Sequence, residues 1–264
     1  MHILYTCFPE GKHKVLTMSY DDGTLADRRL VEIFRKYGIR GTFHLNSGLC
    51  GKERIPKEEW KALYEGQEIS CHTVLHPTIE RSPIDQVAVQ VLEDRRELER
   101  VAGYPVRGMS YPNGSYTEEI VRLLPMLGIE YCRVVGDTDD FGMPENYLTW
   151  KATCHHNHNL IENGKRFLAL DKKQYLYLMY VWGHSFEFDR QGNWELIEEF
   201  CEMMAGKDDI WYATNIEIVD YMKAAKNLKF TVDGDRVYNP GAASVWISVD
   251  GEIREVPGGA MIRI

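Results

Sequence analysis

Two adjacent carboxylates, Asp21 and Asp22, stand at the end of the strand-like run KVLTMSY (14–20). Neighbouring carboxylates repel each other, and their burial is unfavourable unless a positive group lies close by. The triplet Asp-Asp-Gly also suits a turn, which needs no functional explanation. A catalytic or metal-binding role for the pair therefore depends on which other polar residues the fold brings to the same place.

The stretch CHTVLHP (71–77) places His72 and His76 four residues apart, so that both imidazoles face one point if the segment forms a helical turn. Two histidines and one carboxylate are a common ligand set for a divalent metal and leave positions for water and substrate. The spacing alone is equally typical of histidines that cap a helix. A third histidine, His184, stands at another strand end and is either a core side chain or a proton donor, because imidazole titrates near neutrality.

The elements that must position these residues alternate along the chain between short apolar strands and amphipathic helices. Such repeats predict a parallel sheet covered by helices, and a count of about seven units favours a closed (β/α) barrel over an open sheet. In such barrels the active site lies at the carboxyl ends of the strands. The expected strands are 14–20, 41–46, 67–73, 106–112, 129–135, 175–185 and 210–214, and the expected helices are 25–38, 56–66, 82–103, 116–128, 194–206 and 215–227.

The composition argues against several classes of partner. Against 31 lysines and arginines stand 40 aspartates and glutamates, and the formal net charge of -9 disfavours nucleic acid and anionic lipid, which attract basic surfaces. No stretch has the pattern of a signal peptide or the length of a membrane span. The six cysteines are scattered without a CxxC pair, as expected of buried free thiols in a reducing compartment. We therefore expect a cytoplasmic protein that binds neither nucleic acid nor membrane.

The pattern changes near residue 228. From there the residues alternate between apolar and polar, and the sequences VDGD and VDGE are hairpin signals. We predict a barrel over residues 1–227 and a small antiparallel β appendage over residues 228–264. The appendage is expected to cover an exposed end of the barrel, with sugar binding through Trp246 as the alternative.

Four motifs, SYDDG, HTVLHP, RGMSYPNG and WGHSFEF, together resemble those of the polysaccharide deacetylase family, which is the NodB-homology or carbohydrate esterase family 4 domain. They occur in the family's order, and the similarity runs from about residue 14 to about residue 222. The resemblance implies a distorted (β/α)7–8 barrel that removes acetyl groups from carbohydrates. It also implies one divalent metal ion, with zinc foremost and cobalt, nickel or manganese as alternatives.

Carried over by position, the resemblance makes Asp21 the catalytic base and Asp22, His72 and His76 the metal ligands. A bound metal lowers the pKa of its water, and a nearby carboxylate can take the proton as the water attacks an acetyl carbonyl. His184 then serves as the acid that protonates the leaving group.

The turn 111–114 is expected to supply a backbone N–H to the developing oxyanion, which places Tyr111 and Asn113 beside the substrate. Two positions depart from the family pattern. Ser110 occupies the position at which the family has an arginine that orients the base, so Arg107 either replaces that arginine or is a structural ion-pair partner. Asp140, with Phe141, resembles the pair that tunes the acid histidine, or else lies in a solvated loop.

These residues predict a metal-dependent hydrolase that acts on an acetylated oligosaccharide or a small acetylated sugar, with an N- or O-linked acetyl group. One alternative is hydrolysis of a C–N bond in a small non-sugar amide, and another is a carbohydrate-binding barrel without catalysis. The sequence leaves the oligomeric state open. His155, His156 and His158 form either a second metal site or a group of exposed loop histidines.

Overall fold

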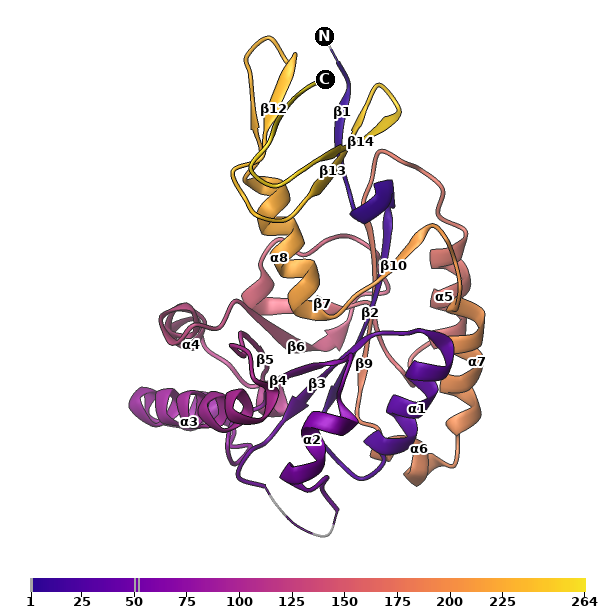
Figure 1. The fold of residues 1–264 in the computed structure, drawn as a ribbon. Helices are drawn as coiled ribbons and strands as arrows, with labels where there is room; N and C mark the ends of the chain where they lie inside the picture. Colours follow the sequence, from indigo (N-terminus) through magenta and orange to yellow (C-terminus); the bar gives the residue numbers. More distant parts are fainter. Residues whose placement is uncertain (1, 50, 52) are drawn as a thin grey trace.

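The centre of the molecule is a parallel sheet, seen in Figure 1, which shows the computed structural model. The structure describes residues 2–49, 51 and 53–264. Within them nine strands make up this sheet, and every paired strand in it runs parallel to its neighbour. The strands are β2 (Lys14–Asp21), β3 (Gly41–Leu45), β4 (Glu68–Cys71), β5 (Gly108–Ser110), β6 (Tyr131–Asp137), β7 (Trp150–Ala152), β8 (Cys154–His155), β9 (Tyr177–Gly183) and β10 (Ile210–Tyr212).

The segment 150–155 closes this sheet into a barrel. Its first part, β7, pairs with β6, and its last part, β8, pairs with β9 at the far side of β2. Between them, the Thr153 N–H donates to the Tyr180 carbonyl over 2.8 Å. Because the order β7-β6-β5-β4-β3-β2-β9-β8 begins and ends in one stretch of chain, the described strands form a ring of seven, with β10 added beside β2. The predicted distorted (β/α)7–8 barrel is confirmed.

Strand β2 pairs with three other strands, β3, β9 and β10, and each of its residues is buried. It pairs with β9 from Lys14 to Tyr20 and with β3 from Met18 to Asp21. A parallel strand covered on both faces reads as a nearly continuous apolar run, which is why KVLTMSY carries few charges. The register aligns Tyr20 with Gly183, so the residues that follow β2 and β9 leave the sheet side by side.

Helices cover the barrel on its outer side (Figure 1). Gly38 follows the last residue of α1 and Gly103 follows the last residue of α3, and both have the left-handed conformation that favours glycine. The predicted helix 116–128 is shorter than expected, because a 3₁₀ turn containing Pro125 replaces its second half. The helices are α1 (Asp27–Tyr37), α2 (Lys57–Leu63), α3 (Ile84–Ala102), α4 (Glu118–Leu123), α5 (Leu160–Leu168), α6 (Phe186–Gln191), α7 (Trp194–Met204) and α8 (Asn215–Lys226).

A group of antiparallel strands lies at the end of the barrel where the parallel strands begin, and both chain termini lie there (Figure 1). Its two small sheets have the orders β1-β13-β14 and β11-β12-β15, so the N-terminal strand β1 belongs to the same structure as the C-terminal region. A second buried apolar cluster joins the two parts and includes Phe8, Trp150 and Val245. The strands are β1 (Leu4–Cys7), β11 (Lys229–Phe230), β12 (Arg236–Tyr238), β13 (Val245–Val249), β14 (Glu252–Val256) and β15 (Met261–Arg263).

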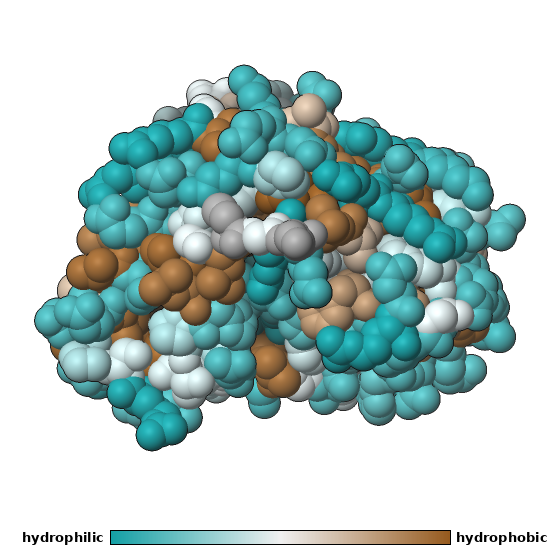
Figure 2. All heavy atoms as spheres, turned by 90° about the horizontal axis from the view of Figure 1, so that it is seen from below, coloured by the Kyte–Doolittle hydropathy of each residue, from teal (hydrophilic) through white to brown (hydrophobic). Residues whose placement is uncertain are grey.

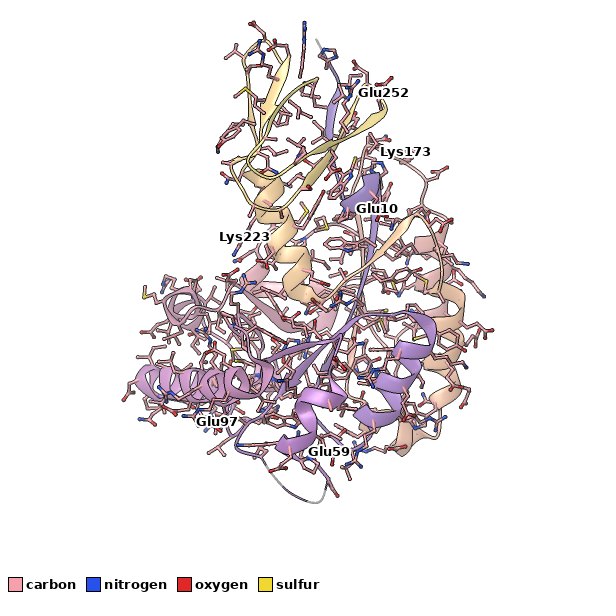
Figure 3. All side chains as sticks on the ribbon, viewed as in Figure 1. Glu10, Glu59, Glu97, Lys173, Lys223 and Glu252 are labelled. Atoms are coloured by element: carbon pink, nitrogen blue, oxygen red, sulfur yellow. The ribbon has the colours of Figure 1, made fainter. Side chains whose placement is uncertain are left out.

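Charged side chains gather on the outside of the molecule, as the labelled glutamates and lysines in Figure 3 illustrate. The five cysteines among the described residues are free and buried, and Cys50 lies outside the described residues. Among the described residues, no helix combines the length and the apolar composition that a bilayer crossing requires.

Candidate metal centre and active site

The structure brings Asp22, His72 and His76 together at the carboxyl end of the barrel. One ligand atom from each lies within 4.8 Å of those of the other two. The Nε2 atom of His72 is 4.0 Å from the Oδ1 atom of Asp22, and the centroids of the two imidazole rings are 4.7 Å apart. The three residues that the sequence predicts as metal ligands therefore converge.

The loop between the two histidines has an unusual backbone conformation and does not form the helical turn that the spacing suggested. Thr73 and His76 have positive φ angles of 66° and 55°, and so does Asp22, at 82°. The Asn46 amide donates to the carbonyls of His72 and Thr73 over 2.6 and 3.0 Å. Positive φ is rare for residues other than glycine and concentrates at functional sites, where the surrounding contacts impose it.

Ser110, which stands where the family has its arginine, links His72 to Asp21. The Ser110 hydroxyl donates to Asp21 Oδ1 over 3.0 Å and accepts from His72 Nδ1 over 2.7 Å. The Nδ1–H of His72 also faces the Ser110 carbonyl at 2.9 Å. With its proton on Nδ1, His72 presents a bare Nε2 lone pair towards Asp22, which is the form that binds a metal.

Electrostatics favour the same state of His72. Burial lowers the pKa of His72 to about 4, although Asp21 and Asp22 oppose this shift. The ring is therefore neutral near pH 7, as a metal ligand must be. Neither His72 Nε2 nor Asp22 Oδ1 has a hydrogen-bond partner among the described residues, and Arg54 forms an ion pair with Asp22 at 3.2 Å. Two buried ligand atoms that face each other and make no hydrogen bond fit a divalent cation, and the ion pair with Arg54 is made by the same Oδ1 atom of Asp22.

Asp21 is held by a residue that sequence reasoning missed. Arg133, on β6, is fully buried and forms an ion pair with Asp21 Oδ2, and its guanidinium lies 4.5 Å from the centre of the Trp182 ring. Burial alone would raise the pKa of Asp21, but Arg133, followed by His72, holds it well below its usual range. The signal in the sequence is a charged residue inside the otherwise uncharged run YCRVV (131–135).

Arg107 does not occupy the position predicted as one alternative. It directly precedes β5, at the end of that strand away from Asp21, and its guanidinium pairs with Asp220 at 2.6 Å and with Glu130 at 2.9 Å. Arg107 is therefore the structural ion-pair partner that the sequence left as the second alternative, and Arg133 makes the contact to Asp21 instead.

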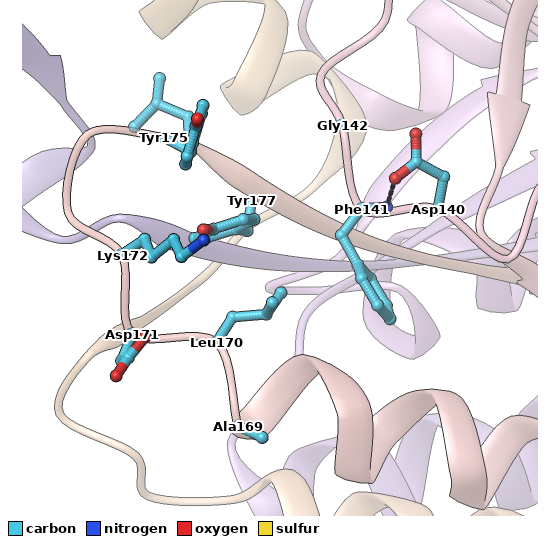
Figure 4. A pocket seen from close by; sticks show the side chains of 10 residues that line it. Asp140, Phe141, Gly142, Ala169, Leu170, Asp171, Lys172, Tyr175 and Tyr177 are labelled. Atoms are coloured by element: carbon cyan, nitrogen blue, oxygen red, sulfur yellow. Dashed lines mark hydrogen bonds between the residues drawn. The ribbon is translucent and has the colours of Figure 1, made fainter.

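Asp140 also lies away from the metal centre. Its carboxylate accepts the N–H of Phe141 over 2.7 Å, and it lines a pocket of about 440 Å³ with Lys172 and Tyr175 (Figure 4). The Phe141 carbonyl accepts a hydrogen bond from the Leu178 N–H at the start of β9. His184 follows the other end of that strand, about 20 Å away at a rise of about 3.3 Å per residue. The prediction that Asp140 tunes His184 is wrong, because the chain turns back along the sheet after β6.

His184 leaves β9 next to the end of β2, and the carboxylate beside it belongs to Glu187. The His184 Nδ1 atom is 3.4 Å from Glu187 Oε1. Burial alone would lower the pKa of His184, but Glu187, Asp21 and Asp22 together raise it above its ordinary value. The imidazole is thus biased towards its protonated form.

The turn after β5 contains one backbone donor that is free to meet a ligand. The N–H groups of Tyr111, Gly114 and Ser115 all donate to backbone carbonyls, and Pro112 has none. Among the described residues the Asn113 N–H has no such partner, and Asn113 adopts a left-handed φ of 55°. Tyr111 is buried, its hydroxyl donates to the Leu148 carbonyl over 2.9 Å, and its ring stacks on Tyr116.

A pocket of about 600 Å³ opens beside Asp22 at this end of the barrel. Figure 2 views this end of the molecule and shows a mostly hydrophilic face that is hollowed near its centre. The pocket's lining combines charges of both signs with one aromatic ring, that of Phe186, on which the guanidinium of Arg190 lies at 4.8 Å. Its volume is typical of small-molecule sites.

The chain folds into a parallel α/β barrel of the NodB type, and it carries two imidazoles and two carboxylates at the carboxyl ends of its strands. The sequence profile of the family described as "Polysaccharide deacetylase" matches residues 9–132. The match covers a little under half of the chain, so over this part the chain is similar to the polysaccharide deacetylase family. Among curated proteins, the peptidoglycan-N-acetylmuramic acid deacetylase PdaC of Bacillus subtilis is 22% identical over 113 residues, which are 42% of this chain; the chain spans 24% of that protein's length.

Solved structures share the fold. One from Mycobacterium smegmatis, provisionally assigned as a polysaccharide deacetylase, superimposes with a TM-score of 0.64 at 19% identity, and the match covers 83% of this chain and 93% of that one. A CE4-family pseudoenzyme from Bacillus anthracis superimposes with a TM-score of 0.53 at 16% identity, over 82% of this chain and 68% of that one. At such identities the likeness shows the fold alone.

Proposed function

We propose that this chain is a metal-dependent hydrolase that removes acetyl groups from an acetylated oligosaccharide or a small acetylated sugar. The observation that carries the proposal is the convergence of Asp22, His72 and His76 beside a second carboxylate and a half-buried histidine. The facing atoms His72 Nε2 and Asp22 Oδ1 make no hydrogen bond within the described residues. The similarity of residues 9–132 to the polysaccharide deacetylase family supports the reaction class, and the geometry of the site supports the assignment of roles.

The donor set of two imidazole nitrogens and one carboxylate oxygen suits zinc, with cobalt, nickel and manganese as alternatives. When bound there, such a cation would polarise an acetyl carbonyl and lower the pKa of a water molecule. The cation would be held by Asp22, His72 and His76, with Ser110 fixing the ring of His72.

The remaining residues hold and move protons. Arg133 keeps Asp21 ionised, so that this carboxylate can accept a proton from the attacking water. His184, whose pKa is raised, keeps a proton that it can deliver to the leaving amine or alkoxide. The Asn113 N–H is suited to the oxyanion that develops on the acetyl carbonyl. The pocket beside Asp22 would take the sugar, with the Phe186 ring as an apolar contact.

The test is acetate release from acetylated xylo- and chito-oligosaccharides and small acetylated sugars, measured with zinc-loaded and chelator-treated protein. We expect acetate from the zinc-loaded wild type and none after chelation. D21N serves as the matched variant, because it removes the base while keeping the metal ligands. Metal and sugar binding without acetate would instead support a carbohydrate-binding barrel, and amine release from small non-sugar amides would support the C–N hydrolase. A pseudoenzyme among the structural neighbours makes this distinction necessary.

A further inference from the structure

The carboxylate of Glu187, in the first turn of α6, lies among three histidines that come from two places in the fold. Its Oε2 atom is 3.0 Å from His155 Nε2 and 3.1 Å from His156 Nε2, while its Oε1 atom is 3.4 Å from His184 Nδ1. His155 ends β8, His156 follows it, and His184 follows β9. One carboxylate therefore connects the histidine pair of the segment 154–158 with the predicted acid.

His155, His156 and Glu187 have the composition of a second metal site, and their donor atoms lie within 4.8 Å of one another. The hydrogen bonds argue for a different role. The Asn157 N–H donates to His155 Nδ1 over 3.1 Å, so Nδ1 is an acceptor and the proton of the neutral ring sits on Nε2, facing Glu187. A nitrogen that carries a proton cannot ligate a metal.

The metal centre described above shows the opposite arrangement. There the Nδ1 proton of His72 faces a carbonyl and Nε2 is bare. A metal-bound histidine ordinarily has its second nitrogen held by an acceptor. The Nδ1 atom of His156 has no such partner among the described residues. The two clusters thus share residue types but differ in where their protons lie.

We propose that Glu187 is a positioning residue for His184, and that His155 and His156 clamp the Glu187 carboxylate in place. The inference rests on the function proposed above, in which His184 is the acid. It replaces Asp140, which the sequence suggested for this task, with a carboxylate three residues after the histidine on which it acts.

The packing shows why the clamp is rigid. The His156 ring is fully buried, between Phe188 at 4.1 Å and Tyr20 at 5.7 Å between ring centroids, and it is nearly parallel to Tyr20. A Cβ atom at Gly183 would lie 2.1 Å from His156 Nδ1, so a glycine is needed there to admit the ring. His155 packs against Trp182 at 4.6 Å.

The charges around His184 come from two elements. Glu187 faces it from α6, and Asp21 and Asp22 act on it from the end of β2. Burial would raise the pKa of Glu187, but His155, His156 and His184 hold it below its usual range. Glu187 is therefore ionised, and it is the one of the three carboxylates that contacts the imidazole directly.

The experiment compares wild type, E187Q and H155Q, with E195Q as a control that makes the same change at an exposed glutamate of the adjacent helix. The pKa of His184 is measured by NMR titration of its ring proton, assigned with H184Q, and zinc binding is counted by calorimetry. We expect E187Q to lower the pKa of His184 by about one unit or more, H155Q to lower it less, and E195Q to leave it unchanged.

We also expect one zinc per chain in wild type, E187Q and H155Q. An unchanged pKa of His184 in E187Q would overturn the proposal. So would two zinc ions in wild type and one in E187Q, which would make the cluster a metal site. Neither readout requires turnover, so both test the pairing independently of acetate release, whereas an inactive wild type would refute the proposed function.

Discussion

Replacing Arg133 by methionine should destabilise the protein strongly, because it leaves the buried Asp21 carboxylate without its positive partner. In R133M the new side chain would fill much of the same buried space but leave Asp21 without its positive partner. Removing one member of a buried ion pair typically reduces the free energy of unfolding by about 3–5 kcal/mol. The double variant D21N/R133M contains neither charge, so it should be destabilised by several kcal/mol less than the sum of the two single variants.

The assay is urea unfolding at pH 7 with chelator present, so that differences in metal occupancy do not contribute. R107M is the control, because it makes the same change in a partly exposed ion pair and should change the free energy of unfolding by only about 0–1 kcal/mol. If the effects of D21N and R133M add without coupling, the ion pair does not hold Asp21 and the account of this carboxylate fails.

Two further predictions concern the base of the barrel. Burial raises the pKa of Glu68 to about 7, against hydrogen bonds from Tyr131, the Ile216 N–H and Thr42. A carboxyl group whose pKa is raised on folding contributes stability that is lost as the pH rises through that pKa. The free energy of unfolding of wild type relative to E68Q should therefore fall by about 2.5 kcal/mol from pH 5 to pH 8. A difference that stays constant with pH would exclude the raised pKa of Glu68. In G108A the new Cβ would lie 2.0 Å from the buried Tyr131 ring, so thermal unfolding should show a free energy of unfolding that is lower by about 2 kcal/mol or more. The control G51A, whose new Cβ would have no atom within 4 Å, should unfold like wild type.

The sequence was most informative where chemistry follows from strand order. Asp21, Asp22 and His184 each follow an apolar run, and parallel strands in a barrel bring their carboxyl ends to one face, so their convergence with His72 and His76 could be expected before any contact was known. The barrel and the glycines that end its helices could be predicted in the same way, because apolar runs and helix ends are local signals.

Contacts between side chains on different strands could not be read in this way. Arg133 reaches Asp21 across four intervening strand pairings, from β6 through β5, β4 and β3 to β2, and nothing in the local sequence fixes that register. The prediction for Asp140 was wrong for a related reason. The direction of the chain after β6 depends on the segment 150–155, which closes the barrel. That segment carries strands of only three and two residues, too short for an alternating pattern to predict.

Calorimetric titration of zinc into wild type, D21N and D22N tests the assignment of the two adjacent carboxylates most directly. We predict that wild type and D21N each bind one zinc with similar affinity, and that D22N binds at least about 100-fold more weakly because it lacks one of three ligands. Equal loss of zinc in both variants, or no loss in D22N, would contradict the division of Asp22 as ligand and Asp21 as base.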